Sequence, residues 1–160
     1  MKLYIKQKIF SIGDKYDIFD EEGNIVYDVK SEIFTMMAKI HLYDSFWTEQ
    51  FFIKKKLTFL LAQYEIYKGD FLCATVAQEF AFFRSKLRVD SAYGNFTIDG
   101  NFWSMDYNMM KDGVYFGSIH KKWLSWGDSY ELDIPNSEDA GFLCALVIAI
   151  DNCMHQENNN

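Results

Sequence analysis

The run AGFLCALVIAI, from Ala140 to Ile150, has no charged or polar side chain over about three helical turns. Asn136 or Ser137 stands before it as a candidate N-cap. Glu138 and Asp139 then place negative charge in the first turn, where it interacts favourably with the helix dipole. The stretch therefore predicts a helix near the carboxyl end of the chain.

A helix that is apolar on every side must be surrounded on every side, either by lipid or by protein. The run has 11 residues, whereas a helix needs about 20 to cross a bilayer. We therefore expect a buried core helix and no transmembrane segment.

The totals favour one globular domain, over residues 1–156, followed by a polar tail over 157–160. Aromatic residues make up 18% of the 160 residues and there is one proline, which favours packed sheet over disorder. The net charge of -7 argues against nucleic acid as a partner, because binding to it requires a positive field.

The cysteines are three in number and lie far apart, at Cys73, Cys144 and Cys153. Neither a disulfide framework nor a zinc site is indicated by that spacing. Lysines interrupt the apolar residues of the first ten positions, which leaves no apolar stretch for a signal peptide. These features predict a cytoplasmic protein.

Short β-type runs alternate with turn signals throughout the chain before the helix, which is typical of an all-β sandwich or barrel. The DEEGN stretch at Asp20–Asn24 predicts a hairpin turn, as do Asp99–Asn101 and Lys111–Gly113. The predicted strands cover residues 2–9, 15–20, 25–30, 38–43, 50–56, 64–68, 72–79, 84–90, 95–99, 102–108, 114–121 and 129–134.

A repeat becomes visible when the chain is compared with itself. Residues 5–20 read IKQKIFSIGDKYDIFD, residues 53–68 read IKKKLTFLLAQYEIYK, and residues 119–133 read IHKKWLSWGDSYELD. The copies share a lysine at the fourth place, then a tyrosine, then an acid directly after it. The shared positions are Lys8, Lys56 and Lys122; Tyr16, Tyr64 and Tyr130; and Asp17, Glu65 and Glu131.

The match between the first two copies continues far enough to suggest a unit of about four strands. Three such units would give twelve strands, and an antiparallel sheet of that size tends to close and remove its edges. A barrel of about twelve strands has a lumen too wide for its own side chains to fill. The predicted fold is a mainly β, twelve-stranded antiparallel closed barrel around a central hydrophobic C-terminal helix.

This combination of repeat, strand count and apolar helix resembles the LURP-one-related family, whose members are similar to the Tubby C-terminal domain and the phospholipid scramblases. The segments that carry the resemblance are residues 5–32, the middle copy IKKKLTFLLAQYEIY, and SYELDI followed by EDAGFLCALVIAIDNCM. It implies a Tubby-like barrel. Tubby-type domains bind phosphoinositide headgroups through basic residues of the wall, but the residues of that site do not map individually onto this chain.

Lysines form the strongest candidate site. Lys54, Lys55 and Lys56 follow one another in a predicted strand, where alternate side chains share a face, so the first and third could meet a phosphate pair. Alternatively, lysines on the outer wall keep a barrel soluble and discourage edge pairing. The predicted anion- or lipid-binding residues are Lys54, Lys56, Lys121 and Lys122.

No catalytic residue, cofactor or metal site is predicted. The acidic turn from Asp20 to Glu22 lacks the spacing of a calcium loop. His41, His120 and His155 lie on three different predicted elements and belong to no metal-binding motif. Nucleophile and nucleotide-binding motifs are also absent from the sequence.

Dense aromatic pairs suggest a second kind of contact surface. In a strand one member of each pair should face outward. The outward rings would either form cross-strand pairs on the wall or a patch for a partner or membrane interface. The pairs are Phe46-Trp47, Phe51-Phe52, Phe82-Phe83, Phe102-Trp103 and Trp123 with Trp126.

These observations predict a binding module rather than an enzyme, because the helix should occupy the cavity where a pocket would lie. By family analogy we expect it to recognise phospholipid headgroups or the membrane surface, peripherally from the cytoplasm. The alternative is a protein-interaction or scaffolding domain that uses the outward aromatics. Oligomeric state and the identity of the ligand are not encoded in any motif.

Overall fold

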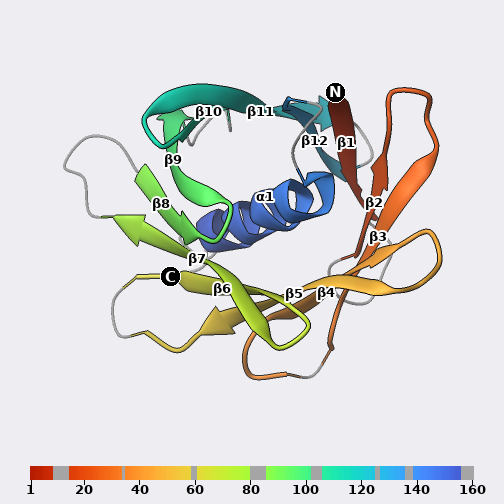
Figure 1. Ribbon diagram of the computed structural model, residues 1–160. Helices are drawn as coiled ribbons and strands as arrows, with labels where there is room; N and C mark the ends of the chain where they lie inside the picture. Colours follow the sequence, from red (N-terminus) through yellow and green to blue (C-terminus); the bar gives the residue numbers. More distant parts are fainter. Residues whose placement is uncertain are drawn as a thin grey trace.

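The structure is a computed structural model and describes residues 1–8, 15–33, 35–58, 61–79, 86–101, 106–124, 127–135 and 139–155. In these ranges a ring of strands encloses one helix, α1 (Ala140–His155) (Figure 1). The predicted tail at 157–160 lies outside them. The strands are β1 (Lys2–Gln7), β2 (Lys15–Phe19), β3 (Ile25–Ser31), β4 (Lys39–Asp44), β5 (Glu49–Lys56), β6 (Gln63–Lys68), β7 (Phe71–Glu79), β8 (Lys86–Ser91), β9 (Gly94–Asn101), β10 (Asp106–Lys111), β11 (Val114–Leu124) and β12 (Gly127–Asp133).

The sheet is a closed antiparallel barrel, as predicted. Each strand pairs with the next in the chain, and β1 also pairs with β12, with Lys2 opposite Asp133 and Ile5 opposite Tyr130. This last pairing closes the ring, so that none of the described strands has an unpaired edge.

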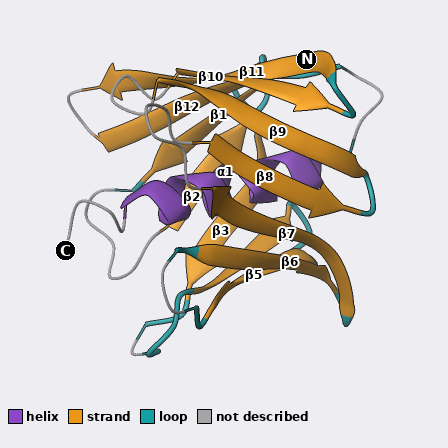
Figure 2. Ribbon diagram, turned by 90° about the vertical axis from the view of Figure 1, so that its left-hand side faces the viewer, coloured by secondary structure: helices purple, strands orange, loops and turns teal. Residues whose placement is uncertain are grey.

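The two ends of the barrel differ. The hairpin turns 20–24, 45–48, 69–70, 92–93 and 112–113 all lie at one end, where α1 begins, and we call this the turn end. The opposite end, where α1 finishes, is the helix-exit end. In Figure 2 the turn end lies to the right.

The helix fills the barrel because both partners present apolar side chains. Alternate residues of the strands point inward, for example Phe51 and Ile53 on β5, which are 1% and 0% exposed. Every residue of α1 from Gly141 to Asp151 is buried. The hydrophobic core is therefore a single cluster formed by the wall and the helix together.

The helix cap differs from the prediction. α1 begins at Ala140, and Asp139 is its N-cap rather than a first-turn residue, because its Oδ1 accepts a hydrogen bond from the Phe142 backbone N–H at 3.0 Å. Aspartate is as effective an N-cap as serine or asparagine. The predicted caps, Asn136 and Ser137, lie outside the described residues. At its other end the helix continues past the apolar run to His155.

The repeat has a clear structural meaning. Its tyrosines point inward to the end of α1: Tyr16 and Tyr130 both donate hydrogen bonds to the buried Asp151 carboxylate, and the Tyr64 hydroxyl lies 3.4 Å from the Asn152 carbonyl oxygen. Its lysines and acids pair on the outer wall. The Nζ-to-carboxylate distances are 2.6 Å for Lys8–Asp17, 3.2 Å for Lys56–Glu65 and 3.5 Å for Lys122–Glu131.

The spacing of the copies is less regular than the predicted unit. The first two copies fall on β1–β2 and β5–β6, four strands apart, but the third falls on β11–β12, six strands further along. Twelve strands are present, although they are not three equal units. Because the ring closes between β12 and β1, the third copy lies beside the first.

One predicted hairpin turn is wrong. Asp99–Asn101 belongs to β9, which pairs with β10 through Gly100 opposite Tyr107. The glycine is needed for close approach, because a Cβ at Gly100 would lie 2.1 Å from the Asp106 carbonyl oxygen. The predicted strand 102–108 is correspondingly replaced by β10, and residues 102–105 lie outside the described ranges.

Gly100→Ala is expected to lower the free energy of unfolding by about 2 kcal/mol, because backbone atoms would have to move apart. Gly69→Ala is the matched control: a Cβ there meets nothing within 4 Å, and only its positive φ of 57° opposes alanine. The control should cost about 1 kcal/mol. Urea unfolding measures both, and equal losses would contradict the close approach of β10.

The aromatic pairs divide into two classes. Phe51 is buried and Phe52 faces outward, as the alternation along β5 predicts. Phe46 and Trp47 instead lie together in the β4–β5 turn, where both are exposed, at 86% and 61%. The side chains of Phe82, Phe83, Phe102, Trp103, Trp123 and Trp126 lie outside the described set.

Candidate functional site

Two of the predicted lysines do lie together. Lys54 and Lys56 share one carboxylate on the neighbouring strand, with their Nζ atoms 3.7 and 3.2 Å from the Glu65 oxygens. Their side chains are 43% and 51% exposed, so both reach solvent. The two-residue period of β5 places them on the outer face, as predicted.

A third lysine joins them from β4. Lys39 stands directly opposite Lys54 in the β4–β5 register, and its Nζ lies 3.2 Å from Glu32. Like charges directly opposite one another are unfavourable in a sheet. We call Lys39, Lys54 and Lys56 the lysine row. Its three ammonium groups face two carboxylates, those of Glu32 and Glu65.

Both carboxylates are held in the charged form. Burial alone would raise the pKa of Glu65, but hydrogen bonds from Tyr67 and Lys56 outweigh it and lower that pKa. Hydrogen bonds from Lys39 and His41 lower the pKa of Glu32. The ion pairs thus persist at neutral pH, and the row retains a formal excess of one positive charge.

The other two predicted lysines lie elsewhere. β11 is separated from β5 by half of the ring, so Lys121 and Lys122 are not brought near the lysine row. Lys122 faces outward and pairs with Glu131, whereas Lys121 is 8% exposed and lies opposite the inward-facing Tyr130. Adjacent residues of a strand face opposite ways, which explains the difference.

Charge is distributed unevenly along the barrel axis. Among the described residues, acids dominate in and beside the hairpin turns, and lysines dominate at the strand termini of the helix-exit end. At the turn end the acids include Asp20, Glu21, Glu22, Asp44, Glu49, Asp70 and Asp112, beside Lys2, Lys68 and Lys111; at the helix-exit end the lysines include Lys8, Lys15, Lys39, Lys54, Lys55, Lys56 and Lys122, beside Asp17, Glu32, Glu65 and Asp106. The helix-exit end is therefore basic, although the net charge of the whole chain is -7.

Apolar side chains project beside the lysine row. Leu57, directly after Lys56, is 82% exposed, and Met36, in the β3–β4 loop, is fully exposed. A hydrogen bond of 2.9 Å from the Lys55 N–H to the Ala38 carbonyl joins the two segments, so they are neighbours. Ile33, in the same loop as Met36, is 45% exposed.

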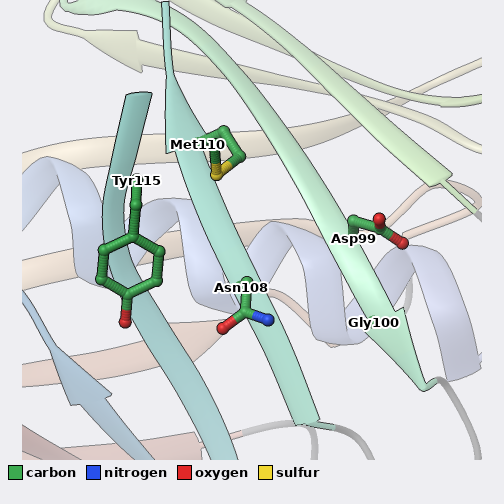
Figure 3. A pocket seen from close by; sticks show the side chains of 5 residues that line it. All are labelled: Asp99, Gly100, Asn108, Met110 and Tyr115. Carbon is green, nitrogen blue, oxygen red and sulfur yellow. The ribbon is translucent and has the colours of Figure 1, made fainter. Parts of the chain in front are cut away.

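A shallow hollow lies on a different part of the wall, over β9, β10 and β11. Its volume is about 330 Å³. Figure 3 shows Asn108 between Tyr115 on one side and Asp99 on the other. Met110 and Gly100 complete the lining. With a carboxylate as its charged group, this hollow is not suited to an anion.

A metal site is not indicated among the residues that the structure describes. No three His, Cys, Asp or Glu side chains there gather around a possible metal position. The two carboxylates nearest His41 lie on opposite sides of its ring: Glu49 is 2.6 Å from Nδ1 and Glu32 is 3.2 Å from Nε2. The three side chains therefore do not converge on one point. Among the same residues, no helix combines the length and apolar character needed to span a membrane.

The fold defines a class of protein, the twelve-stranded antiparallel barrel with a central C-terminal helix. The model of the LURP-one-related family matches residues 1–151, and the chain belongs to that family. It is similar to the uncharacterized protein YxjI of Bacillus subtilis (strain 168), with 30% identity over 159 residues, covering 99% of this chain and 97% of that protein. Its fold is similar to the X-ray structure of a protein from Arabidopsis thaliana, with a TM-score of 0.66, 17% identity, and coverage of 94% of this chain and 90% of the other.

Proposed function

We propose that the barrel is a non-enzymatic binding module that recognises anionic phospholipid headgroups at a membrane surface, and that the lysine row is its contact. The observation that carries the proposal is the placement of three lysines against two carboxylates at the basic end of an otherwise acidic molecule. Phosphate oxygens would supply the missing negative charge.

The interior of the barrel supports a binding role over an enzymatic one. Enzyme pockets are concave and enclose their substrates. Here the lumen is occupied by α1, whose residues Phe142 to Ile150 are each at most 2% exposed. The surfaces available to a ligand are therefore the outer wall and the two ends.

The double reversal of Lys54 and Lys56 to glutamate is expected to weaken binding to vesicles of phosphatidylcholine mixed with phosphatidylglycerol by at least about tenfold. Each lysine near an anionic surface contributes about 1 kcal/mol, and reversal replaces attraction with repulsion. Vesicle co-sedimentation at low and high salt measures the effect, and wild-type binding should weaken as salt screens it.

The matched control reverses two lysines at the turn end. Lys2 and Lys68 are 41% and 50% exposed and each is paired with a carboxylate, so the change in net charge is the same and the exposure of the replaced side chains is similar. The control should bind as wild type does, and thermal unfolding confirms that both variants are folded. Equal binding by the Lys54/Lys56 variant and wild type would refute the proposed site.

A second candidate function, protein interaction through exposed aromatics, is favoured by the turn end. Phe46, Trp47, Phe71 and Tyr115 are all more than half exposed there. They stand among acids such as Asp44 and Asp70, so a protein partner at this end would be basic.

A further inference from the structure

We infer that Met36 and Leu57 enter the boundary between headgroups and acyl chains when the lysine row lies against an anionic bilayer. This inference rests on the proposed function and deepens it, because it names a bilayer rather than a free headgroup as the ligand. It also fixes the orientation of the barrel, with the C-terminal end of α1 towards the membrane.

The first step is the position of the two side chains. Both lie in loops beyond the strands, so they project from the end of the barrel and are not part of its wall. Leu57 continues directly from Lys56, and Met36 precedes Lys39 by three residues. The loops are neighbours through the Lys55–Ala38 hydrogen bond. Charge and apolar surface thus occur at one place.

The second step is the choice of occupant. A soluble phosphate would satisfy the lysines but would leave Met36 and Leu57 in water. An anionic bilayer offers negative charge at its surface and apolar chains just beneath, as in interfacial anchors that combine basic and apolar residues. The charge complementarity of the lysine row together with the exposed Met36 and Leu57 therefore favours a bilayer.

The third step excludes the opposite orientation. Exposed apolar residues also occur at the turn end, for example Phe46 and Phe71. There they are flanked by Asp44 and Asp70, and the neighbouring turn adds Asp20, Glu21 and Glu22. An anionic surface would repel this end, so its apolar residues would remain in water.

An environment-sensitive fluorophore tests insertion directly. It is attached to cysteine at position 57, through Leu57→Cys, or at position 46, through Phe46→Cys, in the full chain. Leu57 and Phe46 have similar exposure, 82% and 86%, and the native cysteines are buried, so labelling of the folded protein selects the new thiol. On adding phosphatidylcholine–phosphatidylglycerol vesicles, emission at position 57 should shift to the blue, while position 46 stays unchanged.

Charged substitutions provide the second readout. Leu57→Asp should weaken vesicle binding about tenfold, since burial of one leucine is lost, while the salt dependence set by the lysines remains. Phe46→Asp should bind as wild type. If wild type sediments with the vesicles but position 57 shows no shift and Leu57→Asp binds equally, the inference fails and the proposed function survives. If wild type does not sediment with the vesicles at all, both the inference and the proposed function fail. A blue shift at position 46 instead of position 57 would show that the turn end faces the membrane, which contradicts the inference.

Discussion

Replacing Phe142 with alanine is expected to lower the free energy of unfolding by about 4 kcal/mol. Phe142 is 1% exposed and lies in the first turn of α1, where its ring stacks on Tyr93 at 4.2 Å between centroids. Phe51 of β5 and Phe96 of β9, four strands apart in the ring, each have their ring centroid 6.1 Å from that of Phe142. Alanine would leave a cavity lined by two strands, β5 and β9, and by the β8–β9 turn that carries Tyr93.

The reason for this large loss is that α1 cannot move to close the cavity. The helix touches strands around the ring, so a shift towards one part of the wall would open space at another. Aromatic contacts also add to the area that is buried. The Phe142 site should thus show the upper part of the range for core phenylalanines.

Urea unfolding followed by far-ultraviolet circular dichroism measures the effect. Phe46→Ala removes the same atoms from a position that is 86% exposed, and its effect should stay within about 0.5 kcal/mol. If Phe142→Ala also cost less than about 1 kcal/mol, the helix would not be packed inside the barrel.

The overall fold is predictable because its signals are local and repeated. Alternating strands, turn residues and an all-apolar run at Ala140–Ile150 require no knowledge of which strand pairs with which. Closure of the barrel then follows from the number of strands and the need to surround the helix. The strands, the closed barrel and the central helix are confirmed by the structure.

The errors arise where one residue type permits two structures. Gly100 resembles a turn residue, yet the same absent Cβ allows β10 to approach closely within the sheet. Similarly, several residues that can cap a helix precede Ala140, and the sequence does not determine where the first turn begins. In both cases tertiary contacts decide between local alternatives.

Only part of the candidate site is predictable from the sequence, because the rest depends on how neighbouring strands pair. Strand alternation predicts that Lys54 and Lys56 share a face, and it also allows only one of Lys121 and Lys122 to face outward. Lys39 was missed because its place opposite Lys54 depends on the β4–β5 register, which is set by two strands together. A register search that matched buried positions of neighbouring strands could have found it.

The role of the repeated tyrosines is likewise not predictable from the repeat alone, because the residue that they contact lies far away in the chain. Tyr16 and Tyr130 are separated by more than one hundred residues, yet both reach Asp151, which comes just after the apolar run that predicted the helix. A repeat in the wall thus fixes the depth at which the helix sits.

Asp151→Ala is accordingly expected to lower the free energy of unfolding by about 3 kcal/mol. Asp151 is 7% exposed, and its removal takes the acceptor from the Tyr16 and Tyr130 hydroxyls in the buried end of the barrel. A buried hydroxyl that loses its partner costs about 1–3 kcal/mol. Asp151→Asn keeps one acceptor oxygen and the same shape, so its loss should be smaller.

A double-mutant cycle separates the hydrogen bonds from simple loss of packing. Tyr130→Phe removes only the hydroxyl, and combined with Asp151→Ala it should cost less than the sum of the single changes, with a coupling of about 1 kcal/mol or more. Asp70→Ala, in an exposed turn, controls for the loss of an acidic side chain and should be nearly neutral. Strict additivity of Tyr130→Phe and Asp151→Ala would show that the repeat tyrosine does not hold the helix through this carboxylate.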